Sequence, residues 1–514
     1  MDREAGAPAD ARPEASLGRA DAAVLFVAAA LGAAFRLVPL ASPDLLWQAR
    51  AGDLVLATGR RLTTDAFTLA LRGRPIRDYE PLWEAIVALA DRTPIGLASL
   101  WGANVVLAAL AFVAAAHLAS TQLAAAWARA CGAALVALAV SRHLELRGEL
   151  APVVAIVVAH GLRRGGATRW RRLAPIGLAL IAAPFHRLAW LVSVVPLAWA
   201  IDSLVRGARA RGSGRRRAHR IAAGDVAVAL LSVATFALVM PGALRDSLPT
   251  TSITFAPHLV DGFTPWAAYR HRDDAIPLIT MAVTTFALAG AALAAREHRA
   301  NFADAALLLL LALPGLRWVR FVAMPLLATL PWSIAFVATV FERGLGRSRA
   351  WLRGSVATAT TLAVLAIAAI GVAQWGVGAR VGGYDFRNQP VHAVEWARTH
   401  APHARLFHTY NQGAYLIYRR WPEVGVVIDA RAADVYPDEY AARYYEVLAD
   451  PSRFAAFARD ERLDLAMLLG TNQSSEPLAK SLAQRGWQLV YGDEMARIFA
   501  PGPELPRHAR PLKR

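Results

Sequence analysis

Acidic side chains gather in one polar stretch, residues 42–84, which lies between two apolar segments near the N-terminus. Carboxylates that share a segment with Trp, Leu and Phe at a membrane surface can orient or deprotonate an acceptor hydroxyl, which is general-base chemistry. We expect Asp44 to be this base, with Glu80 (in DYEPLWE) as the second candidate. The alternative role for Asp44 is helix N-capping, because it follows Ser42-Pro43 and precedes an apolar run. The remaining carboxylates of the stretch are Asp53, Asp65, Asp78 and Glu84.

Basic side chains recur at the ends of apolar segments, where they meet the membrane surface. They are Arg147 (in SRHLELRGE), His186, Arg317 and Arg320. A guanidinium group can grip a phosphate through two parallel hydrogen bonds, so we expect these residues to hold the phosphate of a lipid-borne donor. The alternative is that each arginine only reaches from a helix end to the interface, and that His186 is a hydrogen-bonded interfacial histidine.

The composition sets the class of protein that must position these groups. The chain has 514 residues, of which 56% are hydrophobic and 18% are charged, against about 25% charged residues in a soluble domain. The net charge of +17 lies largely in Lys/Arg runs between apolar blocks, so membrane topology explains it better than a nucleic-acid partner. The single Cys131 excludes an intrachain disulfide and a cysteine-based zinc cluster.

Long apolar segments predict a polytopic α-helical membrane protein with about eleven spans, several of them shorter than the roughly 20 residues that cross a bilayer. They lie near 22–40, 95–118, 123–140, 149–162, 173–185, 188–205, 223–241, 275–294, 302–316, 318–341 and 355–376. If the N-terminus is cytoplasmic, alternation puts all four basic loops (163–172, 206–220, 296–299 and 343–353) on the cytoplasmic side, as the positive-inside rule requires. We therefore predict a multi-pass protein of the bacterial inner membrane with an extracytoplasmic C-terminal domain.

The composition changes near residue 380, which divides the chain into parts. We expect a disordered cytoplasmic N-terminus (1–21), a transmembrane domain (22–378) with a first outer loop (41–94), a small α/β domain (379–500) and a loose tail (501–514). In the α/β domain, Gly425–Asp429 (GVVID) is predicted to be a buried strand.

Polar residues after predicted turns and strands give this domain weaker site candidates of its own. Asn411, Asp429 and Arg431 are candidates for acceptor binding, because polar groups at the carboxyl end of a strand often line a site. The alternative is that Asp429 and Arg431 pair with each other or cap the next segment.

The pattern Pro43-Asp44-x-x-Trp47, Gly52, Gly59, Thr64-Asp65-x-Phe67-Thr68, Gly73 and Asp78-Tyr79-Glu80 resembles the first outer loop of bacterial GT-C-type membrane glycosyltransferases. These are similar to the dolichyl-phosphate-mannose–protein mannosyltransferases and the lipid A aminoarabinose transferases. Residues 408–417 (HTYNQGAYLI), with Val427-Ile428-Asp429-x-Arg431, resemble the outer domain that often follows. The resemblance implies a polyprenyl-phosphate-linked sugar as donor, and an Asp of the first outer loop as base, a position that Asp44 matches.

Three departures weaken the carry-over of activity from this family. Gln48 stands where many relatives have His, and Pro184-Phe185-His186 stands where many have Asn-x-His. The better-studied transferases have an acidic pair where this chain has Asp44-Leu45. The motif is therefore more specific for the membrane family than for catalysis.

The function expected is sugar transfer from a polyprenyl-phosphate carrier to an envelope glycan, lipid or protein acceptor at the outer face of the inner membrane. The alternative is a non-catalytic, membrane-anchored α/β binding module. A third possibility, a lipid or sugar transporter or flippase, would need ionisable groups near the middle of the membrane. No cofactor beyond the lipid-phosphate donor is demanded. A divalent metal stays open, because the first loop has enough carboxylates for one but not the spacing of a known metal loop.

Overall fold

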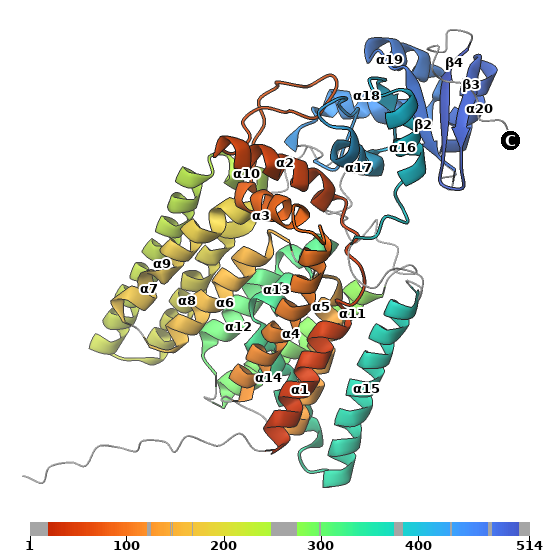
Figure 1. Ribbon diagram of the computed structural model, residues 1–514. Coiled ribbons are helices and arrows are strands. Elements are labelled where there is room, and N and C mark those ends of the chain that lie inside the picture. The colour runs from red at the N-terminus through yellow and green to blue at the C-terminus, as the bar shows by residue number, and fades with distance from the viewer. Residues whose placement is uncertain are drawn as a thin grey trace, which may run out of the picture.

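The structure is a computed structural model that describes residues 19–120, 125–247, 275–374 and 384–502, apart from 144, 146, 167, 298–299, 432–433 and 471–474. The predictions of a disordered N-terminus and a loose tail fall mainly outside these residues. Two parts are visible, a long helical bundle and a smaller α/β part at one end of it (Figure 1).

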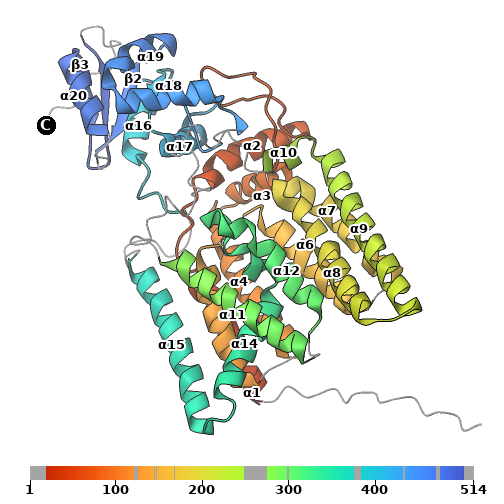
Figure 2. The ribbon, with the colours of Figure 1, turned by 180° about the vertical axis from the view of Figure 1, so that it is seen from behind.

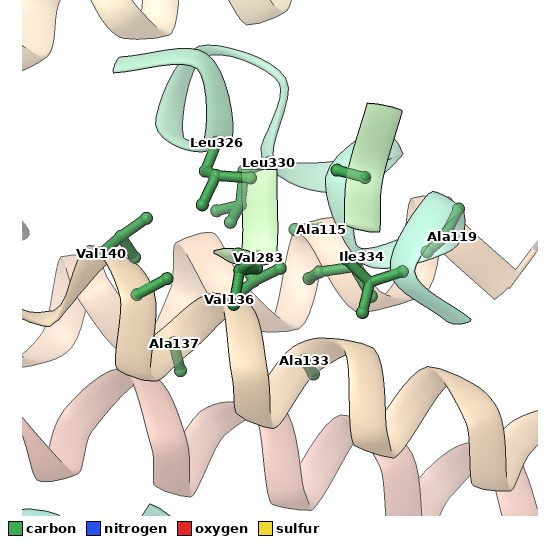
Figure 3. Packing of buried hydrophobic residues seen from close by; sticks show 14 of the residues in the cluster. Ala115, Ala119, Ala133, Val136, Ala137, Val140, Val283, Leu326, Leu330 and Ile334 are labelled. Atoms are coloured by element: carbon green, nitrogen blue, oxygen red, sulfur yellow. The ribbon is translucent and has the colours of Figure 1, made fainter. Parts of the chain in front are cut away.

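The bundle contains two groups of helices, each around its own apolar core. The first group is α1 (Arg19–Ala34), α4 (Ala98–Ser120), α5 (Ala126–Val140), α11 (Ile276–Arg296), α14 (Leu330–Leu345) and α15 (Ala350–Gln374). The second is α6 (Leu150–Arg164), α7 (Arg169–Ala182), α8 (Val194–Arg209), α9 (Ser213–Val239) and α12 (Phe302–Ala312). Figure 3 shows Val136, Val283 and Ile334 packed in the core of the first group.

Small residues allow helices of the first group to approach closely. A Cβ added at Gly290 of α11 would lie 2.0 Å from the carbonyl oxygen of Phe336, and one at Gly132 of α5 would lie 2.5 Å from that of Ile334. Both contacts are to the backbone of α14, so α14 is the helix against which α5 and α11 pack.

Five helical segments are long and apolar enough to cross a membrane, judged by length and composition among the described residues. They are Ala98–Ala119, Arg187–Arg209, Ser213–Val239, Ile276–Arg296 and Ala350–Ala373. Each of the eleven predicted spans overlaps a helix, but the count of eleven is not reproduced by this criterion. The apolar run 318–341 shows why, because it is divided into the short helices η8 (Val319–Phe321) and α13 (Met324–Ala328) and the start of α14.

The described residues of the four basic loops lie at one end of the bundle, and the α/β part lies at the other (Figures 1 and 2). We call these the opposite end and the domain end. Contacts between the basic segments agree with this arrangement, since Arg206 donates to Asn301 over 2.7 Å and Arg343 pairs with Glu297. The predicted sorting of positive charge to one side of the bundle is therefore present in the fold.

A four-stranded mixed sheet forms the C-terminal part. Its strands are β1 (Leu406–Phe407), β2 (Leu465–Leu469), β3 (Trp487–Gly492) and β4 (Ala496–Pro501), in the order β1-β2-β4-β3. Strands β1 and β2 are parallel, and β4 is antiparallel to both β2 and β3. Its helices are α16 (Val391–His400), α17 (Tyr410–Arg420), α18 (Asp438–Ala449), α19 (Phe454–Asp460) and α20 (Glu476–Gln484).

The prediction that Gly425–Asp429 is a strand of this sheet is wrong. Its backbone bonds go to the first loop instead, since the amide of Val426 donates to the carbonyl of Phe67 and the amide of Leu69 donates to that of Val426, both over 2.8 Å. The run is apolar because it is buried, but its partner lies about 360 residues away in the sequence.

The first loop (residues 41–94) lies between the bundle and the C-terminal domain, and contains α2 (Asp44–Thr58) and α3 (Pro81–Asp91) (Figure 1). The two helices touch closely, because a Cβ at Gly52 of α2 would lie 2.0 Å from the carbonyl oxygen of Glu84. One apolar core contains residues of both the first loop and the C-terminal domain. The predicted boundary at 379 therefore divides the sequence but not this core.

Candidate functional site

The predicted base, Asp44, lies at the start of α2 at the domain end of the bundle. Pro43 is the N-cap, and Asp44 is the first residue of the helix, so N-capping is not its role. Its Oδ1 accepts a hydrogen bond from Trp47 Nε1 over 3.2 Å. A carboxylate in the first turn also benefits from the positive end of the helix dipole.

Arg147 lies beside this carboxylate in the turn that leads into α6. Its guanidinium contacts Glu145 Oε2 at 2.6 Å. Burial disfavours the charged form, but the charges of Glu145, Glu149 and Asp44 outweigh this and raise the pKa of Arg147. The side chain is nevertheless 39% exposed. A guanidinium group with this exposure can be reached by a ligand.

Two further residues lie within electrostatic reach of this pair, and neither is among the predicted site residues. Arg36, just beyond α1, is 8% exposed and donates to the carbonyl of Ser141. Burial lowers the pKa of Arg36 to about 10, with Glu145 acting to raise it and Arg147 to lower it. Its signal in the sequence was a lone charge at the end of an apolar segment.

Tyr384 is the second, and it comes from the linker after α15. It pairs with Leu40 through a parallel bridge, and the amide of Asp385 donates to the carbonyl of Leu40 over 2.7 Å. Burial, followed by the charges of Asp44 and Glu145, raises the pKa of Tyr384. Its buried hydroxyl has no hydrogen-bond partner of good geometry among the described residues. No motif marks this residue in the sequence.

The second predicted carboxylate, Glu80, belongs to an adjoining polar set. His186 Nε2 lies 3.2 Å from Glu80 Oε1, and Gln48 Nε2 donates to Glu80 Oε2 over 2.9 Å. The backbone amide of Leu188 donates to His186 Nδ1 over 3.2 Å. Because Nδ1 accepts, the proton of the neutral ring sits on Nε2 and is directed at Glu80. His186 therefore orients this carboxylate.

The pair of Asp44 and Arg147 lies next to the group of Glu80, His186 and Gln48. Asp44 and Gln48 lie one turn apart on α2, which puts both on one helix face. A Cβ added at Gly148 would lie 2.3 Å from the carbonyl oxygen of Phe185 and 3.2 Å from the ring of Trp83. Since Trp83 Nε1 also donates to Gln48 Oε1 over 3.0 Å, the Arg147 turn packs directly on the Glu80–His186 set. The structure thus brings together four predicted residues: Asp44, Glu80, Arg147 and His186.

Two buried carboxyl groups, Glu84 and Asp78, lie near Glu80 in the first loop. Glu84 is 2% exposed, and its Oε2 has no hydrogen-bond partner among the described residues. Burial, and then the charges of Asp78 and Glu80, raise the pKa of Glu84 well above its ordinary value of 4.5. Burial also raises the pKa of Asp78, whose carboxylate accepts from the amides of Leu62 and Glu80. Burial therefore favours the protonated form of Glu84, and Glu80, whose side chain is 21% exposed, is the accessible carboxylate.

Two of the predicted phosphate ligands are not joined to this site by contacts in the described part of the chain. Arg317 is exposed and lies over the ring of Trp318, with its Cζ 4.8 Å from the ring centroid. The backbone of Arg320 forms part of η8, and its side chain lies outside the described residues. Phosphate binding by Arg317 and Arg320 stays a prediction.

The candidates in the C-terminal domain have partners within the protein. Arg431 pairs with Asp429 and with Asp65 of the first loop, both at 2.6 Å, and all three side chains are buried. Asn411 is exposed in the first turn of α17. Acceptor binding by these residues stays a prediction, and internal pairing is the geometry that a structural role for Asp429 and Arg431 requires.

A second charged cluster lies at the opposite end of the bundle. His160 Nε2 contacts Asp304 Oδ1 at 2.7 Å, and Arg164 pairs with the other oxygen of Asp304. Arg163 and Arg172 pair with Asp225 at 3.0 and 2.8 Å. The side chains of His160 and Asp304 are both 0% exposed. Across the described ranges, neither cluster groups three His, Cys, Asp or Glu side chains as a metal ion would require.

Comparison with known proteins gives a match of fold only. No family model and no curated protein matches the chain. The oligosaccharyltransferase of Archaeoglobus fulgidus, solved with a tethered acceptor peptide that contains the NVT sequon, is similar with a TM-score of 0.55 at 13% identity, over 95% of this chain and 74% of that chain. ArnT of Cupriavidus metallidurans, bound to undecaprenyl phosphate, aligns over 94% of this chain and 98% of its own with a TM-score of 0.48 at 14% identity. The expected resemblance is confirmed at the level of architecture, because the chain shares its fold with this oligosaccharyltransferase.

Proposed function

We propose that the protein is a membrane glycosyltransferase that moves a sugar from a polyprenyl-phosphate carrier to an acceptor. The observation that carries the proposal is the meeting of Asp44 and Arg147 at the domain end, where Arg147 is desolvated yet 39% exposed. A phosphate-borne donor needs a fixed cation, and its acceptor needs a carboxylate beside that cation. The GT-C fold, shared with a transferase, supports the same reading.

In this mechanism, Arg147 holds the phosphate of the carrier and neutralises the charge that develops as the sugar leaves. Fixed donors of this kind usually make the largest contribution to catalysis. Arg36 adds positive charge next to Arg147, and the buried hydroxyl of Tyr384, which has only Gln389 near it as a poorly aligned partner, can donate to a phosphate oxygen. Glu145 pairs with Arg147 and fixes its position.

Asp44 acts on the acceptor in the proposed reaction. Its carboxylate accepts the proton of the acceptor hydroxyl as the bond from sugar to phosphate breaks. Glu80, oriented by His186 and Gln48, binds the acceptor or the sugar alongside it. The bond broken joins the sugar to the carrier phosphate, and the bond formed joins the sugar to the acceptor oxygen.

We assign the domain end to the outer face of the inner membrane. The four basic loops gather at the opposite end, and the positive-inside rule favours that end for the cytoplasm. Envelope glycans, lipids and proteins are then the acceptors within reach. A non-catalytic anchor for the C-terminal domain would need no such pairing of a carboxylate with a desolvated arginine.

The test is a transfer assay in membranes that contain the full chain. A panel of radiolabelled undecaprenyl-phosphate monosaccharides is added, and label that leaves the carrier is measured for wild type, Asp44→Asn and the control Asp53→Asn. Asp53 lies on the same helix, paired with Arg50 and Arg92. We expect transfer for at least one sugar and a loss of about 10²–10⁴-fold in Asp44→Asn only. Label that stays with every carrier, or full activity in Asp44→Asn, would overturn the proposal.

A further inference from the structure

We propose that the C-terminal domain is a fixed clamp on the first loop, and that Asp65 and Arg431 are positioning residues for the site carboxylates. The activity part of this inference rests on the proposed function. The clamp itself is a property of the fold and has its own test.

A buried ion set joins the two segments. Arg431 Nη1 donates to Asp65 Oδ1 over 2.6 Å, while its Nε and Nη2 hold both oxygens of Asp429 at 2.8 and 2.6 Å. Tyr436 donates to Asp429 from the other side over 2.6 Å. Burial disfavours the charge of Arg431, but the two carboxylates and Tyr436 outweigh this and raise its pKa. An ion set with these partners loses several favourable contacts at once if the loop separates from the domain.

Main-chain contacts continue the junction next to the ion set. Thr68 and Val426 form a parallel bridge with two 2.8 Å hydrogen bonds across it. A Cβ at Gly425 would lie 2.8 Å from the carbonyl oxygen of Phe67, so the two backbones are too close for any other residue there. Trp421 Nε1 donates to the carbonyl of Ala66 over 3.2 Å. The loop is therefore held by backbone as well as by charge.

A second junction lies on α2 itself. Helix α17 packs along α2 (Figures 1 and 2), where Arg50 Nε donates to the carbonyl of Tyr418 over 3.0 Å. The hydroxyl of Tyr418 donates in turn to Asp91 of α3 over 2.7 Å. Because α2 begins at Asp44 and carries Gln48, anything that fixes α2 also fixes the two site residues on it.

A shared apolar core stabilises these junctions in the closed arrangement. Leu45, Leu46 and Val87 of the first loop belong to the same buried cluster as Leu416 and Val426 of the domain. Opening the junction would expose this core to water at about 25 cal/mol per Å² of apolar surface. We infer that the loop does not open as a lid during turnover, and that the domain sets the position of Asp44. A displacement of 1 Å in such a site can cost 10²-fold in rate.

A disulfide across the bridge tests the clamp directly. The chain has one cysteine, so Thr68→Cys/Val426→Cys is made in a Cys131→Ala background. Partners in a β-bridge lie within the Cα separation that a disulfide spans, about 4.4–6.8 Å. We expect the oxidised and reduced forms of this variant to transfer sugar at rates within about twofold of each other. Activity that is abolished by oxidation and restored by reduction would show that the domain must move, and would overturn the clamp.

Asp65→Asn tests positioning, because Asn keeps the size and one acceptor oxygen but removes the charge that Arg431 pairs with. We expect kcat to fall about tenfold with KM for the donor within twofold, and amide exchange at Leu69 and Val426 to rise at least tenfold. A merely structural role would lower the yield of folded protein and leave kcat unchanged. If wild type transfers no sugar, the proposed function fails, while hydrogen exchange still decides the clamp: unchanged protection in Asp65→Asn would overturn it.

Discussion

The bundle carries a charged cluster at each end, and the two differ in how their charges are satisfied. At the opposite end, His160 and Asp304 are both 0% exposed and contact each other at 2.7 Å. At the domain end, Arg147 pairs with Glu145 but remains 39% exposed, with Asp44 and Glu149 acting on it as well. A closed network of complementary pairs fixes helices relative to each other. An open cluster, in which the cation can still be reached, is the one that can take a ligand.

The hydrogen-bond partners of the two clusters also differ. Trp199 Nε1 donates to the second ring nitrogen of His160 over 3.2 Å, and Asp304 also accepts from the amide of Asn301 at the start of α12. His160 and Asp304 at the opposite end are therefore occupied by a helix start and a neighbouring ring. At the domain end, by contrast, the Tyr384 hydroxyl is buried without a well-formed partner in the described part of the chain.

A loss of activity comparable to that of Asp44→Asn is expected at Arg147. Arg147→Gln removes the charge that we assign to the donor phosphate and should lower transfer by about 10²–10³-fold, the loss typical for one fixed donor at a developing charge. Arg92→Gln is the matched control, because Arg92 is 53% exposed and pairs only with Asp53 among the contacts described. Initial rates at saturating carrier measure the effect. Equal rates for the two variants would contradict the role of Arg147 in holding the donor phosphate.

The largest effect on stability is expected at the opposite end. Asp304→Asn leaves Arg164 and His160 without their shared carboxylate, and breaking a buried pair costs about 3–5 kcal/mol. The melting temperature in detergent should fall by several degrees, while the transfer rate per folded molecule stays within about twofold of wild type. A variant that melts normally but loses transfer would reverse the roles of the two clusters.

The pH dependence of stability offers a smaller test at Glu84. Below its ordinary pKa of 4.5 the carboxyl is protonated in both states and has no effect. As pH rises through this value, the unfolded chain ionises while the folded protein keeps the proton, so stability falls until pH passes the raised folded pKa. Glu84→Gln removes this loss. Melting temperatures at pH 5 and pH 8 should converge in the variant, whereas parallel curves for variant and wild type would contradict a raised pKa of Glu84.

The smallest effect is expected at Arg317, the predicted phosphate ligand that lies exposed over Trp318. An exposed arginine beside an aromatic ring at a helix end contributes little. We expect Arg317→Gln to change KM for the carrier by less than about threefold. A loss as large as that of Arg147→Gln would extend the donor site to η7 (Pro314–Leu316) and its neighbours.

The candidate residues that the sequence marked by local chemistry are the ones that the structure brings together, and their role stays a prediction. Asp44 and Glu80 in a polar loop, and Arg147 and His186 in short turns, were recognisable because charges between apolar segments are costly without a role. Tyr384 and the Asp65–Arg431 pair were not, because their significance comes from contacts over more than 300 residues. The strand assigned to Gly425–Asp429 failed for the same reason, since an apolar run does not reveal its partner.

The most direct test of the account is the binding of undecaprenyl phosphate to the two ends of the bundle. Dissociation constants are measured by native mass spectrometry for wild type, Arg147→Gln and Asp304→Asn. Charge-assisted hydrogen bonds contribute about 1.5–3 kcal/mol, so Arg147→Gln should bind the lipid about 10–150-fold more weakly. Asp304→Asn should bind it as wild type does. Unchanged binding in Arg147→Gln would contradict the claim that the open cluster at the domain end holds a lipid phosphate.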